Sequence, residues 1–116
     1  MTPKQFRKYL DRDSGCWHCG EQEAIAPHHR ANRGLGGSKR RDNPANIIVL
    51  CSLVNGLLES SPIWAHRGRL HGWKLASWED PLMVPVYDVQ TQAWYLLDDE
   101  WGRTRLSVLQ DIDLEL

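Results

Sequence analysis

Residues 15–60 read GCWHCGEQEAIAPHHRANRGLGGSKRRDNPANIIVLCSLVNGLLES, and this stretch decides how we expect the chain to fold. It contains all three cysteines, two adjacent histidines and a glycine-rich basic run. Candidate cation ligands follow the cysteines at fixed offsets, so one stretch supplies the residue types for both a zinc-type turn and a catalytic metal site. We therefore treat residues 15–60 as the core and residues 61–116 as an extension.

The size and composition of the chain predict one small domain over residues 1–116. It has 116 residues, of which 41% are hydrophobic and 25% are charged, enough for a modest core. The longest apolar run, residues 47–51, is far shorter than the roughly 20 residues that a bilayer span needs, and no leader-like segment opens the sequence. We expect a soluble, cytoplasmic protein with no membrane partner.

The cysteines favour a reducing compartment. Their number is odd, and Cys16 and Cys19 form a Cys-x-x-Cys pair that Cys51 follows much later in the chain. This pattern suits metal binding or reduced thiols better than a secreted disulfide framework. A redox pair and simple buried thiols are the other interpretations.

Charge is distributed unevenly although the net charge is only −1. Residues 1–58 hold nine Lys/Arg against five Asp/Glu, whereas residues 59–116 hold five against ten. Glycines in the basic loop would let its backbone approach a phosphate. Residues 30–45 form this loop, and the predicted contacts to a DNA backbone are the five cations that precede its first acid, Asp42: Arg30, Arg33, Lys39, Arg40 and Arg41. A plain solvated loop is the alternative.

Local patterns predict an α+β fold. Thr2 and Pro3 suit the start of a helix over residues 2–12, and the apolar run to residue 51 reads as a strand before a helix over residues 52–59. A second helix would start at Ser61 and end at Gly72, and residues 84–88 and 93–97 read as a hairpin. Five tryptophans follow residue 60, and we expect them to build the core more often than to stack on bases: Trp64, Trp73, Trp78, Trp94 and Trp101.

The adjacent histidines, His28 and His29, carry the chemical interpretation. Neighbouring side chains on a strand point to opposite sides of the chain, so one imidazole can ligate a cation while the other reaches a water. Hydrolysis of a phosphodiester needs a base for the water and a cation for the charge on the phosphate. Imidazole exchanges protons near neutral pH, which suits the base role.

In this order and spacing, the motifs resemble those of the HNH endonucleases of the ββα-metal fold, particularly the small members encoded by tailed bacteriophages. The resemblance covers residues 15–60 and is carried by Cys16-x-x-Cys19, residues 26–30, residues 36–38, residues 44–51 and residues 55–60. It implies a ββα-metal core flanked by an N-terminal helix and a C-terminal β-hairpin. The implied activity is metal-dependent DNA cleavage in the cytoplasm of a phage-infected host.

The resemblance also implies a role for each matching residue. His29 takes the place of the general base, and Asn46 takes the place of the residue that orients the site. His28 and Asn55 take the places of ligands to one divalent cation, and an amide oxygen suits magnesium or manganese. Asn55 departs from the family, because a histidine usually stands there.

A second departure concerns the structural zinc of the family. Cys16, Cys19 and Cys51 match three of its ligands, but Val54 stands where a fourth cysteine is usual. Water or a nearby histidine would then complete the coordination of zinc, or apolar packing around Val54 would replace the ion. The sequence is compatible with both outcomes.

Two other classes of function fit the same residues. One is a catalytically inactive module that binds DNA or a phage or host protein, such as a phage inhibitor of a host factor. The other is a structural module in which zinc binding by Cys16, Cys19 and Cys51 is the only role of the motif.

Overall fold

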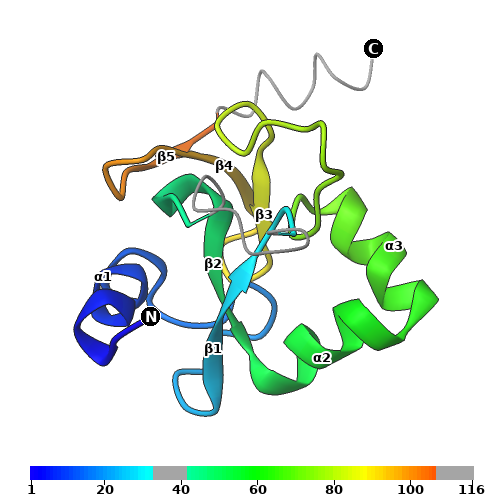
Figure 1. The fold of residues 1–116 in the computed structure, drawn as a ribbon, viewed down its shortest axis with the longest axis horizontal. Helices are drawn as coiled ribbons and strands as arrows, with labels where there is room; N and C mark the ends of the chain where they lie inside the picture. Colours follow the sequence, from blue (N-terminus) through cyan, green and yellow to red (C-terminus); the bar gives the residue numbers. More distant parts are fainter. Residues whose placement is uncertain (33–41, 107–116) are drawn as a thin grey trace.

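The buried strand β2 (Ile47–Cys51) lies at the centre of the structure, a computed structural model that describes residues 1–32 and 42–106 (Figure 1). It pairs antiparallel with β1 (Ile25–His29), and the register sets Ile25 opposite Cys51 and His29 opposite Ile47. The helix α2 (Ser52–Ser60) follows β2 directly. The described residues form a small α+β domain with three α-helices and two small sheets, so the α+β part of the predicted fold is confirmed.

Different helices cover the two faces of the β1–β2 pair. Ile48 and Leu50 belong to the main apolar cluster, which includes residues of α2, whereas Ile47 and Val49 pack with Tyr9 of α1 (Pro3–Asp13). Residues opposite each other in an antiparallel pair share a face. His28, opposite Ile48, therefore faces α2, while His29, opposite Ile47, faces α1. Figure 1 accordingly shows α1 and α2 on opposite sides of the two strands.

The helix α1 begins and ends close to the predicted bounds. Thr2 caps it and forms a capping box with Gln5, because each side chain bonds the backbone N–H of the other. At its other end, Arg12 and Asp13 form a buried ion pair with an N–O distance of 2.6 Å. Asp13 accepts a hydrogen bond from the N–H of Val49, and Arg12 donates to carbonyls that include that of Ile47. These bonds fix α1 against β2.

The helix α3 (Pro62–Leu70) follows α2 after a break at Ser61. The Ser61 hydroxyl accepts a hydrogen bond from the N–H of Trp64, and Pro62 occupies the first turn, as predicted. A short 3-10 helix, η2 (Pro44–Asn46), leads into β2. Among residues 1–32 and 42–106, no helix combines the length and the apolar character that crossing a membrane requires.

The second sheet has three antiparallel strands: β3 (Val86–Asp88), β4 (Ala93–Leu97) and β5 (Arg103–Arg105). Alternate residues of β4 are buried against the main cluster, which contains Trp17 and Trp73. The strand β5 was not predicted, because its sequence is polar throughout. Arg103 nevertheless binds Asp88 of β3 and lies over the ring of Trp17.

The tryptophan prediction is right for Trp73 and for Trp64, which packs against the main apolar cluster, and it is wrong for Trp78. Trp73 has no exposed surface, whereas Trp78 is 87% exposed. Trp101 is partly exposed, on the turn between β4 and β5. Only part of the aromatic surface of the chain therefore goes into the core.

Candidate functional site

His28 and Asn55, the predicted cation ligands, lie in contact between β1 and α2. The Nδ1 atom of His28 is 3.2 Å from the Oδ1 atom of Asn55. The Nε2 atom of His28 lies 2.8 Å from the carbonyl oxygen of Trp73, and the residue is almost fully buried. Asn55 stands in the first turn of α2 and remains partly exposed. The fold therefore brings together one imidazole nitrogen and one amide oxygen.

Both ring nitrogens of His28 lie next to an oxygen that only accepts, the Trp73 carbonyl at Nε2 and Asn55 Oδ1 at Nδ1. A neutral ring can donate to only one of them, and when Nε2–H donates to Trp73 the lone pair of Nδ1 faces Asn55 Oδ1. Burial lowers the pKa of His28, while its hydrogen bonds to Trp73 and Asn55 oppose that shift. In that tautomer Nδ1 has no proton to donate to Asn55 Oδ1, and the two atoms can instead ligate one cation together.

The separation of these two atoms fits a shared hard cation. Neighbouring ligands of an octahedral magnesium ion, each about 2.1 Å from the metal, are about 3.0 Å apart. A further oxygen donor, Glu59, lies one turn after Asn55 on α2, and its charge acts on His28. The carboxylate of Glu59 lies 3.4 Å from Lys74 Nζ. Glu59 was not predicted from the sequence, although its i, i+4 spacing from Asn55 is the signal that identifies it.

His29 lies on the other face of β1, paired with an acid. Its Nε2 atom is 2.9 Å from Oδ1 of Asp42. A carboxylate accepts, so Nε2–H is the donor and Nδ1 keeps the lone pair that can take a proton. The sequence did not predict Asp42 as the partner of His29, although its position directly after the basic run is a signal for it.

Asn46 fastens the end of β1 to the start of β2. Its Oδ1 accepts from the N–H of Ala31 at 2.8 Å, and its Nδ2 donates to the carbonyl of Ala31 at 3.0 Å. The N–H of Arg30 donates to the carbonyl of Asn46 at 2.7 Å. Asn46 is fully buried, so these bonds hold the chain directly after the two histidines in one place.

Arg30 corrects one prediction. It was expected to contact a DNA backbone, but only 1% of its surface is exposed. Its guanidinium donates to four backbone carbonyl groups, those of Gly72, Ala45, Pro81 and Val84. Burial, with the charge of Arg12 second, lowers the pKa of Arg30. The side chain joins distant segments and is not available to a phosphate. The other four predicted backbone contacts, Arg33, Lys39, Arg40 and Arg41, lie outside the described residues.

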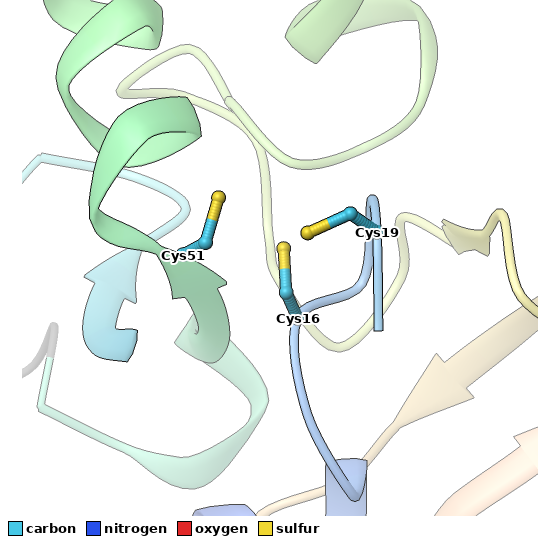
Figure 2. A group of neighbouring side chains, drawn as sticks. All are labelled: Cys16, Cys19 and Cys51. Atoms are coloured by element: carbon cyan, nitrogen blue, oxygen red, sulfur yellow. The ribbon is translucent and has the colours of Figure 1, made fainter. Parts of the chain in front are cut away.

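Cys16, Cys19 and Cys51 form a cluster whose sulfur atoms all lie within 4.8 Å of one another (Figure 2). Cys16 and Cys19 come from the turn after α1, and Cys51 ends β2. The N–H of His18 points to the sulfur of Cys16, and the N–H of Val54 points to that of Cys51, each at 3.4 Å. The cluster could hold a metal ion.

The donor set of the cysteine cluster suits a soft cation. Burial raises the pKa of the Cys16 thiol to about 11, so a metal that bound there would displace a proton. Val54 is buried in the main apolar cluster with Cys16 and Cys51. Within the described part of the chain, the cluster has three members among its cysteines, histidines and acids. The described residues thus offer one ligand fewer than a four-coordinate structural zinc site.

Comparisons with protein-family models, curated proteins and solved structures give no match for this chain. Its function must therefore be inferred from its own side chains. Two groups carry chemistry: His28 with Asn55 on the α2 face, and His29 with Asp42 on the α1 face. The cysteine cluster lies beside the start of α2 and is a separate candidate metal centre.

Proposed function

We propose that the chain is a metal-dependent DNA endonuclease of the HNH type, with a ββα-metal core in residues 15–60 and a C-terminal hairpin extension. The observation that carries the proposal is the 3.2 Å contact between His28 Nδ1 and Asn55 Oδ1. These residues come from β1 and α2, and the order of β1, β2 and α2 is the order that such a core requires. The proposed setting is the cytoplasm of a phage-infected bacterium.

His28 and Asn55 would hold one magnesium or manganese ion, and the negative charge of Glu59, which acts on His28, would favour that ion. When bound, the cation would stabilise negative charge on the scissile phosphate and on the leaving oxygen. The bond from His28 Nε2 to the Trp73 carbonyl keeps Nδ1 directed at Asn55.

His29 is the proposed general base. A water oxygen attacks the phosphorus, one phosphorus–oxygen ester bond breaks, and the proton of the water passes to His29 Nδ1. The Asp42 carboxylate accepts from Nε2–H and stabilises the imidazolium that forms. The leaving oxygen takes its proton from solvent. Asn46 positions both histidines by holding Ala31.

The remaining predicted residues have supporting roles in this proposal. Arg33, Lys39, Arg40 and Arg41 would contact the DNA backbone with little regard to sequence. Cys16, Cys19 and Cys51 would hold a structural zinc beside the start of α2.

The test is nicking of supercoiled plasmid DNA in magnesium or manganese. His29→Ala should abolish nicking and leave the fold intact, and Asp42→Asn should slow it by about 10- to 100-fold, because the base loses its orienting carboxylate. Asp11→Asn, at an exposed acid on α1, is the control and should nick at the rate of the unmodified chain. Equal activity of His29→Ala would remove His29 from the mechanism.

One observation favours a second candidate, a catalytically inactive module that binds DNA or a protein. His28 is only 4% exposed, so a cation could reach it only along the Asn55 side. Such a module should bind DNA or a phage or host protein without cleaving DNA in any divalent cation. A titration with magnesium, manganese, nickel and zinc on plasmid and branched DNA separates the two candidates.

A further inference from the structure

A cavity of about 470 Å³ lies on the α1 face of the β1–β2 pair, next to His29 and Asp42. Its wall also includes Lys8 and Tyr9 of α1 and Trp101 of the turn between β4 and β5. We call this the His29 cavity. Its size lies within the range of about 300–1,000 Å³ that small-molecule sites occupy. Of the residues that line this cavity, the proposed hydrolysis uses only His29 and Asp42.

The backbone of Trp101 is strained at this position. Its φ of 58° lies in the left-handed region, which a bulky aromatic residue rarely adopts. The neighbouring bonds impose the conformation, because the Asp98 carboxylate accepts from the N–H groups of both Glu100 and Gly102. Strain of this kind persists where the surrounding structure fixes it, often at a ligand site.

A second set of bonds fixes the Trp101 turn relative to His29. The carboxylate of Asp99 accepts from Asn43 Nδ2 at 2.8 Å and from the N–H of Ala45 at 3.2 Å. Asn43 directly follows Asp42, the hydrogen-bond partner of His29. The aromatic wall and the proposed base are therefore connected through two consecutive residues.

The chemistry of the walls matches a nucleotide. Trp101 is 36% exposed and meets the Tyr9 ring edge to face, with ring centroids 6.0 Å apart. Lys8 Nζ lies over the Trp101 ring, 4.5 Å from its centre. A base that stacked on this ring would displace the ammonium group, which could then contact the neighbouring phosphate. An aromatic ring with a cation beside it is the arrangement that holds unpaired bases in single-strand binding proteins.

We propose that the His29 cavity is a binding subsite for one unpaired base of a DNA strand, adjacent to the phosphate that His29 serves. The base stacks on Trp101, and Lys8 neutralises the neighbouring phosphate. This rests on the proposed function for the position of that phosphate. It deepens the proposal by naming the preferred substrate as single-stranded or branched DNA, in which a base can leave the stack at little cost.

Binding can be measured without cleavage, in EDTA, with a short single strand that carries the fluorescent base 2-aminopurine. The unmodified chain should quench the probe, because stacking on an aromatic ring quenches its emission. Trp101→Ala should lose the quenching and weaken binding about tenfold or more. Trp78→Ala removes a tryptophan that is 87% exposed and not part of the cavity wall, and it should bind like the unmodified chain.

Two further variants keep the test decisive if Trp101→Ala fails to fold, which circular dichroism would show. Trp101→Phe keeps an aromatic face and should retain most of the affinity. Lys8→Ala should reduce the salt dependence of binding, because about one phosphate contact is lost. Unchanged binding in both Trp101→Ala and Lys8→Ala, or no quenching by the unmodified chain, would overturn the subsite.

The outcomes also separate the subsite from the endonuclease. Trp101-dependent quenching in a chain that cleaves no DNA would support the subsite and contradict the proposed function. Cleavage of branched DNA at an equal rate by the unmodified chain and Trp101→Ala would support the function and contradict the subsite.

Discussion

His28 and Asn55 are 27 positions apart in the chain, and their Nδ1 and Oδ1 atoms lie 3.2 Å apart in the fold. The pairing follows from two local features. The register of β1 turns His28 toward α2, and Cys51 caps that helix through a bond from the N–H of Val54, which fixes the place of Asn55 in the first turn. The contact therefore depends on the strand pair and the helix start together.

The first prediction concerns cation binding by this pair. Asn55→Ala should weaken manganese binding by about tenfold or more, because the loss of one ligand is worth at least about 1.4 kcal/mol. Asn55→Asp should strengthen it, since a carboxylate is the harder and charged donor. Titration followed by manganese electron paramagnetic resonance measures both without reference to activity.

Gly56→Ala provides the matched control for α2. An added methyl group at Gly56 meets no atom within 4 Å, and alanine stabilises a helix interior by roughly 0.5–1 kcal/mol relative to glycine. Manganese affinity should stay constant while the melting temperature rises. Equal manganese affinity in Asn55→Ala and the unmodified chain would exclude Asn55 as a ligand.

The sequence was sufficient to predict the orientation of the histidines. Alternation along a strand places His28 and His29 on opposite faces, and the register shows the two faces occupied by α2 and α1. Local signals also predicted α1 and α3, because Thr2 and Ser61 cap them within a few residues of sequence. Helix caps and strand alternation involve residues close together in the sequence, so they can be predicted from it directly.

Long-range contacts could not be read in the same way. Arg30 stands among cations in the sequence, and only folding brings the carbonyls of Gly72, Pro81 and Val84 around it. Asp42 precedes β2, and the pairing of β2 with β1 brings it to His29. The sequence between His29 and Asp42 has no periodic pattern from which this contact could be predicted. The position of Trp101 likewise depends on a polar strand, β5, that carries no alternation signal.

The second prediction follows from the burial of Arg30. Arg30→Met should lower the free energy of unfolding by roughly 3 kcal/mol or more, because several buried carbonyls lose their donor. Arg7→Met changes an arginine side chain that is 75% exposed and should have little effect. Urea denaturation measures both. A stable Arg30→Met that loses only DNA affinity would restore the phosphate-contact role.

The third prediction concerns pH. Burial lowers the pKa of His28 and, with the charge of Arg67 second, those of His18 and His71. The unfolded chain, with histidine pKa values near 6.5, therefore binds more protons than the folded chain as the pH falls. The contribution of these three histidines to the free energy of unfolding should be complete above about pH 6.5. It should be lost as the pH falls from there toward their pKa values in the folded chain.

His28→Gln should make this pH dependence shallower, because one group that must stay neutral is removed. The measurement is the free energy of unfolding in urea at pH 7.5 and pH 5.5, without divalent cations. The difference between the two pH values should be smaller in His28→Gln than in the unmodified chain. An identical difference in both chains would show that His28 does not contribute.

The fourth prediction tests whether the cysteine cluster holds zinc. Cys51→Ser keeps an oxygen that can accept from the N–H of Val54 and so keeps the cap of α2, but it removes one of three sulfurs. We expect this variant to bind less than one zinc ion per chain and to melt at the same temperature with and without a chelator. The unmodified chain should bind one zinc ion and melt lower when a chelator removes it.

Val54→Cys is the opposite change, because it supplies a thiol where Val54 now packs beside Cys51. Without zinc, the smaller side chain should cost about 1 kcal/mol of packing. With zinc, a fourth sulfur should more than offset that loss, since structural zinc prefers four protein ligands. The opposite result is that zinc changes the melting temperature of neither the unmodified chain nor Cys51→Ser but raises that of Val54→Cys. In that case, apolar packing around Val54 has replaced the ion in this protein.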